Sequence, residues 1–379
     1  MIPDFERDVY CLLGLPFDAL DIDAATRKLR EAVQRRSPCF LSTPNLNFVV
    51  AAQADPAFRD SVLHSDMSVA DGMPIVWAAR LLGIPLVERV AGSTLFERLC
   101  TVSGEPIKVY FFGGPEGVAA LACERLNARH SGMQCVGFDA PGFGTVDEMS
   151  DDERVQRIDA SGAEFVVVSL GARKGQAWIE RNRARLKAPL ISHLGAVVNF
   201  VAETTVRAPR WMQYCGLEWL WRIKEEPSLW RRYAHDGVWC ARLLVARVIP
   251  HAIYVRRYTP DAAQLAAAEI AIETDGQRTL VRMAGAWSRT NLAPLRAALA
   301  GVARGVAAVH FDLRAVTHLD AAVVALLCLL WNHCVRTRVQ FVMEPISPVV
   351  RRVFHLCCAE YALEQLPGTP RSATAPAPH

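Results

Sequence analysis

Residues 109–131 read VYFFGGPEGVAALACERLNARHS, an apolar run followed by two glycines and then by a helical pattern. The run is typical of a buried strand, the glycines permit a tight turn, and the spacing of the rest indicates an amphipathic helix. The same order recurs up to about residue 200, with apolar runs at 39–41, 134–137, 165–170 and 190–195 and helical patterns at 24–35 and 174–186. This alternation predicts βαβ units, and therefore an α/β domain with a parallel sheet.

The composition limits the class of protein. The chain has 379 residues, enough for two domains, and its 51% hydrophobic and 21% charged residues are typical of a globular protein. A formal net charge of +3 does not indicate a nucleic-acid-binding surface. Eleven cysteines without a CxxC pair predict neither a disulfide framework nor a zinc site, so we expect reduced thiols in a cytoplasmic protein.

Changes in composition divide the chain. We expect an α/β domain over 1–205, a basic, Trp-rich helical appendage over 206–258, an Ala-rich linker over 259–268, a small second α/β domain over 269–366 and a disordered tail over 367–379. In the second domain we expect hairpin strands at 270–273 and 279–284, helices at 291–302, 321–334 and 347–356, and strands at 308–313 and 338–343.

The appendage mixes tryptophans and arginines with aliphatic residues. This mixture is typical of helices that lie on a membrane interface, and the alternative is a set of docked helices whose tryptophans belong to the core. Arg247, Pro250 and His251 interrupt the most apolar stretch, so we expect no spanning helix there. The acidic amino terminus does not resemble a signal peptide. We therefore expect a cytoplasmic protein, peripheral at the inner face of the cell membrane.

Polar residues follow two of the apolar segments. STPNLN at 42–47 places Thr43, Asn45 and Asn47 after the first predicted strand, where ligands bind in open α/β sheets. The alternative for this segment is an ordinary turn with a helix cap. Asp71, which precedes Gly72 and a helical stretch, is a candidate general base, and a helix N-cap is its alternative.

Two later strand-to-helix turns contain glycines, which let backbone N–H groups approach a phosphate. The first turn holds Gly113 and Gly114, and the second holds Gly171, Lys174 and Gln176. Neither has the spacing of a dinucleotide fingerprint or of a P-loop. In the appendage, the arginines suit a diphosphate because a guanidinium group donates two parallel hydrogen bonds.

Taken in sequence order, these clusters resemble the WecG/TagA/CpsF glycosyltransferases over about residues 9–235. The resemblance rests on TPNLN, ADG, ERVAG, FFGG, LGA, RAPRW, GLEWLWR and EPSLWRRY. Within the family the chain is most similar to the exopolysaccharide branch typified by the xanthan-assembly glucosyltransferase GumM, with which it shares HLGAVVNF at 193–200.

The resemblance implies a Rossmann-like enzyme that moves a sugar from a UDP-sugar to a polyprenyl-diphosphate-linked saccharide with inversion, without a metal or other cofactor. It also implies that the appendage faces the membrane and that the pathway is exopolysaccharide or surface-glycan biosynthesis. Asp71 would be the catalytic base, with Thr43 also in the catalytic site. The implied substrate-binding residues are Asn45, Asn47, Gly113, Gly114, Gly171, Lys174, Gln176, Arg207, Arg222, Arg231 and Arg232.

Residues 269–365 resemble a STAS domain, in the order of their predicted elements and in VHFDLRAVTHLD at 309–320. In signalling STAS domains a phosphorylatable Ser or Thr follows the last Asp of this segment, whereas Ala321 follows it here. A phosphoswitch at that position is therefore excluded, and the resemblance favours a module that docks a protein partner.

One turn departs from the family pattern. Pro-Lys-Gln-Glu in the family is Arg173-Lys174-Gly175-Gln176 here, which leaves the donor sugar open. The departure motivates an alternative function, a catalytically weak adaptor that binds a glycan or nucleotide sugar and recruits partners through the STAS domain. A nucleotide-dependent oxidoreductase is disfavoured because the dinucleotide fingerprint is absent.

Overall fold

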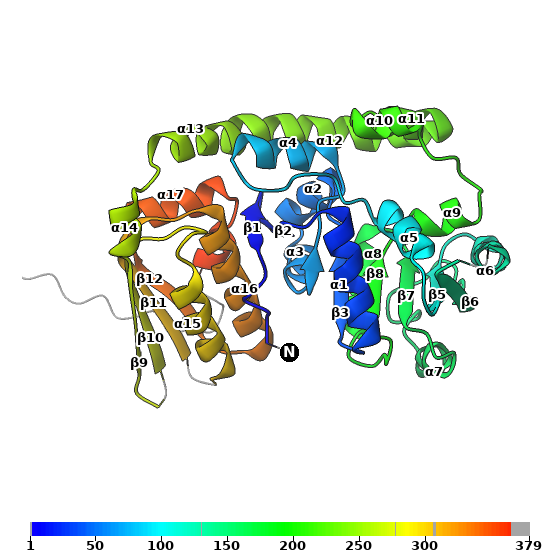
Figure 1. Cartoon of the computed structure of the whole chain (residues 1–379), viewed down its shortest axis with the longest axis horizontal. Helices are drawn as coiled ribbons and strands as arrows, with labels where there is room; N and C mark the ends of the chain where they lie inside the picture. The colour runs from blue at the N-terminus through cyan, green and yellow to red at the C-terminus, as the bar shows by residue number, and fades with distance from the viewer. Residues whose placement is uncertain (1, 130, 277, 306–307, 365–379) are drawn as a thin grey trace, which may run out of the picture. The chain divides into compact units, whose positions relative to one another are not determined.

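The computed structural model describes residues 2–129, 131–276, 278–305 and 308–364 (Figure 1). Its contacts divide the chain into two compact units, Asp8–Ile253 and a smaller one that joins Met1–Arg7 to the segment from Tyr254 onward. The predicted disordered tail lies outside the described residues.

The larger unit contains the predicted parallel sheet. Its six strands lie in the order β4-β3-β8-β7-β5-β6. They are β3 (Cys39–Ser42), β4 (Met67–Ser68), β5 (Ile107–Gly113), β6 (Met133–Asp139), β7 (Phe165–Ser169) and β8 (Leu190–His193). The two-residue β4 and the preceding hairpin of β1 (Val9–Leu12) and β2 (Leu15–Asp18) were not predicted, because such short strands carry little periodicity.

Helices cover both faces of this sheet (Figure 1). Successive strand residues point to opposite faces, so that Phe111 packs under one layer and Phe112 under the other. The first layer consists of α1 (Ile22–Gln34), α5 (Gly92–Thr101), α6 (Val118–Ala128) and α9 (Val197–Val201). The second contains α7 (Asp152–Ala160) and α8 (Ala172–Asn182). This is the Rossmann-like arrangement that the resemblance implied.

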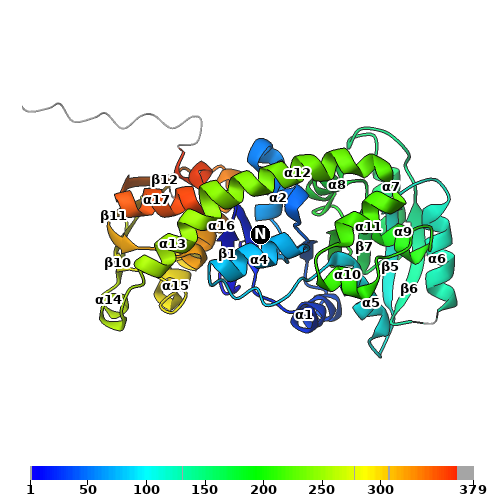
Figure 2. The ribbon, with the colours of Figure 1, turned by 90° about the horizontal axis from the view of Figure 1, so that it is seen from above.

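The remaining helices of this unit lie near the ends of the strands or follow the sheet in sequence. They are α2 (Leu46–Ala54), α3 (Pro56–Leu63), α4 (Met73–Leu81), α10 (Arg210–Tyr214), α11 (Glu218–Glu225) and α12 (Trp230–Leu243). In Figure 2, α12 continues into α13 (Ile249–Arg257).

The apolar stretch that contains Arg247, Pro250 and His251 is helical throughout, and the expectation that it does not span a membrane stays a prediction. Pro227–Arg257 is one helix of 31 residues, and its length and composition would allow it to cross a membrane. A π-helical segment, Leu244–Val248, precedes Pro250 and accommodates it, since proline cannot donate the regular backbone hydrogen bond. Only 28% of the most apolar window of this helix is buried, and core helices of other proteins meet the same criterion of length and composition.

The smaller unit is built on a four-stranded sheet in the order β12-β11-β10-β9. The strands are β9 (Glu269–Thr274), β10 (Arg278–Ala286), β11 (Ala308–His318) and β12 (Phe341–Ile346), and the helices are α14 (Ala262–Ala266), α15 (Ala293–Arg304), α16 (Ala321–Thr337) and α17 (Pro348–Leu356). The predicted alternation is confirmed here. Asp320 accepts hydrogen bonds from the backbone N–H groups of Ala322 and Val323, and so acts as the N-cap of α16.

The prediction that all thiols are reduced was wrong in one place. Cys123 of α6 and Cys135 of β6 form a disulfide, with their Cα atoms 5.2 Å apart. The helix packs directly on the strand that follows it, and this proximity, which cysteine spacing alone does not reveal, makes the bond possible.

Candidate active site

Thr43 and Asp71 lie close together at the carboxyl edge of the sheet, because they follow the adjacent strands β3 and β4. The Asp71 N–H donates to the Pro44 carbonyl at 2.9 Å, which joins the two turns. The Gly92 N–H donates to Asp71 Oδ2 at 3.4 Å. A Cβ on Gly92 would stand 3.4 Å from Thr43 Oγ1 and 2.5 Å from Leu194, so only glycine lets the backbone approach this closely.

Two further charged groups surround Asp71. Arg89 and Glu218 form an ion pair of 2.6 Å that links the loop before α5 to the appendage helix α11, and both side chains are largely buried. Burial raises the pKa of Asp71 from 3.8 to about 6; Arg89 opposes this rise in pKa and Glu218 adds to it. The carboxylate is therefore ionised at neutral pH but more basic than an ordinary aspartate, as a general base requires.

Sequence reasoning missed Arg89 and Glu218 as functional residues. Both lie in motifs that carry the family resemblance, ERVAG and GLEWLWR. Nothing local distinguishes them from ordinary surface charges, because their proximity to Asp71 depends on how the appendage packs.

The two asparagines after β3 have partners within the protein. Asn45 Oδ1 accepts from the Phe48 N–H at 3.2 Å and forms the N-cap of α2, which is the alternative considered for this segment. Asn47 Nδ2 donates to Asp236 Oδ2 of α12 at 3.2 Å, and Asp236 is buried. These bonds fix the turn and attach the appendage to it, while substrate binding by the two asparagines stays a prediction.

The glycine turns lie at the same edge. The Gly114 N–H donates to the Ser169 carbonyl at 2.8 Å, which holds the end of β5 against β7. Gly113 immediately precedes it at the end of β5, and the exposed Gly171 precedes α8. These glycines are therefore placed as predicted, at strand-to-helix turns, and their contact with substrate stays a prediction.

The two polar side chains of the second turn bind protein atoms. Lys174 Nζ donates to the Gly144 carbonyl at 2.8 Å. Gln176 is buried, and its Nε2 donates to Ser42 Oγ at 3.0 Å. Gln176 is therefore hydrogen-bonded to the end of β3, and contact of either side chain with substrate stays a prediction.

Three of the four predicted arginines line one cavity of about 130 Å³. They are Arg207, Arg222 and Arg232, and they share this cavity with the ring of Phe200 and with Glu218. Arg207 is held by an ion pair of 2.5 Å with Glu97. Glu218 lines this cavity, and its charge raises the pKa of Asp71. The arginines and the candidate base therefore belong to one site.

Arg231 does not line this cavity. Its guanidinium lies 5.7 Å from the ring centroid of Trp230, which is exposed. Three of the predicted arginines are thus brought together, and the fourth is not.

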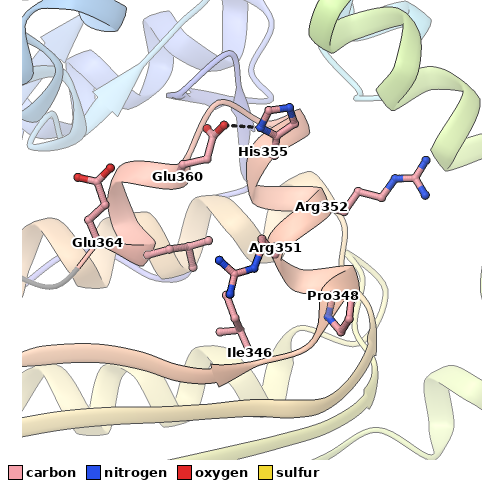
Figure 3. Close-up of a pocket in the computed structure, with 8 residues that line it drawn as sticks. Ile346, Pro348, Arg351, Arg352, His355, Glu360 and Glu364 are labelled. Atoms are coloured by element: carbon pink, nitrogen blue, oxygen red, sulfur yellow. Dashed lines mark ion pairs between the residues drawn. The ribbon is translucent and has the colours of Figure 1, made fainter. Parts of the chain in front are cut away.

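A second cavity, of about 710 Å³, lies in the smaller unit (Figure 3). It is lined by Ile346, Pro348, Arg351, Arg352, His355, Glu360, Leu363 and Glu364. His355 Nδ1 and Glu360 Oε1 form an ion pair of 2.6 Å, and Figure 3 shows Arg352 pointing away from both carboxylates. Its two carboxylates, Glu360 and Glu364, are not buried, whereas burial raises the pKa of Asp71, so the site around Asp71 is the stronger candidate.

Among the described residues, no group of three or more His, Cys, Asp or Glu side chains is placed to hold a metal ion. Metal-independent chemistry therefore stays an expectation from the resemblance.

Comparison with known proteins gives a match for each of the two domains. The model of the glycosyl transferase WecG/TagA/CpsF family matches residues 10–252, and the model of the Mlab STAS domain matches 270–360. An N-acetylglucosaminyldiphosphoundecaprenol N-acetyl-beta-D-mannosaminyltransferase of Bacillus spizizenii is 28% identical over 51% of this chain and 74% of its own length. A protein of the same name from Bacillus subtilis is 24% identical over 53% of this chain and 77% of its own length.

Proposed function

The chain belongs to the WecG/TagA/CpsF family of glycosyltransferases, and on this premise we propose that it moves a sugar from a UDP-sugar to a polyprenyl-diphosphate-linked saccharide with inversion. One observation carries the proposal. Asp71, a carboxylate with a raised pKa, is influenced by the charges of Glu218 and Arg222, which line the cavity that holds the three arginines. The two Bacillus relatives are named for an undecaprenyl-diphosphate-linked acceptor, which supports the class of acceptor. We place the reaction in exopolysaccharide or surface-glycan biosynthesis.

In this mechanism Asp71 removes the proton from the acceptor hydroxyl while that oxygen bonds to the anomeric carbon of the donor sugar. The bond from the anomeric carbon to the diphosphate breaks, and UDP leaves with the bonding electron pair. Arg222 and Arg232 stabilise the negative charge on the leaving group through charge-assisted hydrogen bonds. Inversion follows because the acceptor attacks from the side opposite the leaving group.

The proposal is tested by measuring UDP release from UDP-glucose, UDP-N-acetylmannosamine and UDP-glucuronic acid, with short-chain prenyl-diphosphate mono- and disaccharides as acceptors. Acceptor-dependent release from one donor would establish the transferase and identify its sugar. Intact UDP-sugar binding without any release would instead favour the adaptor, with its STAS domain as the module that docks a partner.

The charges around Asp71 predict two opposite shifts in the pH dependence of transfer. Glu218→Gln removes a negative charge that raises the pKa of Asp71, so the acid limb of kcat/KM should move to lower pH. Arg89→Gln removes the charge that lowers this pKa most, so the acid limb should move to higher pH. Profiles measured from about pH 4.5 to about pH 8.5 test the pair. Shifts of the acid limb in the same direction would exclude Asp71 as the titrating base.

We further propose that the protein binds the inner face of the cell membrane peripherally through an apolar surface on the larger unit. Trp77 of α4, Val245 and Ile249 are 49%, 66% and 41% exposed. The helix α4 contacts the π-helical segment that contains Val245, so these side chains come from neighbouring elements. An exposed apolar surface of this kind, accompanied by arginines, suits an anionic lipid surface.

Replacing Trp77, Val245 and Ile249 together with Ser should weaken binding to phosphatidylglycerol vesicles about a hundredfold, since each side chain buries apolar area worth roughly 1 kcal/mol. Vesicle co-sedimentation measures the change. Phe143→Ser is the control, because Phe143 is fully exposed on the loop after β6, away from these helices in sequence, and its replacement should not affect binding. Equal losses in both variants would exclude this surface.

A further inference from the structure

His193 ends β8, and it is a buried polar residue that the proposed mechanism does not use. β8 lies beside β3 in the sheet, with Ser192 opposite Leu41, so His193 is next to the turn that carries Thr43. Only 8% of its surface is exposed. Its Nε2 is buried and has no hydrogen-bond partner among the described residues, an arrangement that destabilises the free protein.

The imidazole of His193 fills the place of a missing side chain. A Cβ on Gly175, in the first turn of α8, would stand 2.3 Å from His193 Cδ2, so residue 175 has to be a glycine in the presence of this ring. Position 175 belongs to the turn in which the chain departs from the Pro-Lys-Gln-Glu of its family. A ring from a strand thus occupies the space that a helix side chain would otherwise occupy.

The unpartnered nitrogen lies between Gly175 and Gly195, close to the candidate site. A Cβ on Gly195 would stand 3.2 Å from His193 Nε2, and Gly195 is exposed. The next residue, Ala196, lines the cavity that holds the three arginines. The Nε2 therefore lies next to an exposed glycine that is one residue from the lining of that cavity.

The charge state of His193 limits its ligand. Burial lowers the pKa of the imidazole to about 4, so the ring is neutral at physiological pH. A neutral imidazole offers a hydrogen bond without a positive charge, which suits a hydroxyl or amide group better than a diphosphate. The arginines of the cavity already provide for the diphosphate.

We propose that His193 is a donor-binding residue whose Nε2 hydrogen-bonds a hydroxyl or acetamido group of the transferred sugar. This inference rests on the proposed transferase function and extends it to sugar recognition. Because the free protein leaves the nitrogen unpaired, a ligand that pairs it removes an existing cost, and the gain contributes to affinity for that sugar. Sugars without a polar group at that position do not obtain this gain.

The test compares His193→Leu with the wild-type protein by calorimetric titration of UDP-N-acetylmannosamine, UDP-glucose and UDP alone. Leucine keeps an apolar side chain against Phe48, whose ring centroid lies 6.2 Å from that of His193, but it has no polar atom. We expect the Kd of the UDP-sugar that the wild type prefers to rise about tenfold, while the Kd of UDP stays the same. His193→Gln, whose amide supplies a polar group in place of the imidazole nitrogen, should recover most of the lost affinity.

His251→Leu is the control for a non-specific effect of replacing a buried histidine. His251 is also buried, 3% exposed, but lies in the long appendage helix, so its replacement should leave both Kd values unchanged. An unchanged ratio of UDP-sugar to UDP affinity in His193→Leu, with wild-type transfer intact, would overturn the inference and leave the proposed function standing. Absence of UDP-sugar binding by the wild type would overturn both.

Discussion

Replacing Asp71 with Asn should lower kcat for sugar transfer by about 10²–10⁴-fold, the usual contribution of a general base. Asn has the shape of Asp but cannot accept the proton of the acceptor hydroxyl. The KM of the donor should change little, because the arginines that line the cavity remain in place. Measuring acceptor-dependent UDP release at saturating donor gives kcat directly.

The same substitution should not destabilise the protein at neutral pH. The pKa of Asp71 is 3.8 in an ordinary setting and about 6 in the fold, so the wild type loses stability as pH rises from about 4 through about 6. Asp71→Asn avoids this loss. Its melting temperature at about pH 7.5 should therefore equal or exceed that of the wild type. Asp151→Asn, at an exposed N-cap of α7, is the control that should keep full turnover. Unchanged turnover in Asp71→Asn would exclude Asp71 as the base.

Replacing Trp178 with Ala should lower the free energy of unfolding by about 3–5 kcal/mol, which is typical of a fully buried aromatic residue. Trp178 of α8 has no exposed surface and stacks on Phe112 of β5 with ring centroids 4.2 Å apart. Its Nε1 also donates to the Met149 carbonyl at 2.9 Å, so the substitution leaves an acceptor unpaired as well as a cavity.

Urea denaturation followed by circular dichroism measures this loss. Trp230→Ala is the matched control, because Trp230 is 55% exposed and its replacement should change stability by about 0.5 kcal/mol or less. A loss below about 1 kcal/mol in Trp178→Ala would show that α8 is not held to the sheet by this residue. Since α8 carries Gly175 and Gln176, activity should fall together with stability.

The sequence determined the elements of the fold and the chemistry of several site residues. The apolar runs of β5 and β7 are largely buried on both faces, and amphipathic helices follow them, so these elements could be predicted from their own residues. Local pattern made Thr43 and Asp71 candidates, each with a turn or helix cap as the alternative, and the family resemblance implied their place in the catalytic site. The helix cap formed by Asn45 was available as an alternative for the same reason.

Only the tertiary structure decided which distant residues meet. Arg89 and Glu218 are 129 positions apart, and Asn47 and Asp236 are 189 apart, yet both pairs form hydrogen bonds. These contacts depend on strand order and on how the appendage packs, which local periodicity does not encode. The space that His193 occupies against Gly175 is likewise a property of packing, since neither residue alone is unusual in the sequence. Local patterns thus specify most of the elements and offer candidate residues, whereas long-range packing specifies the charges and contacts around Asp71.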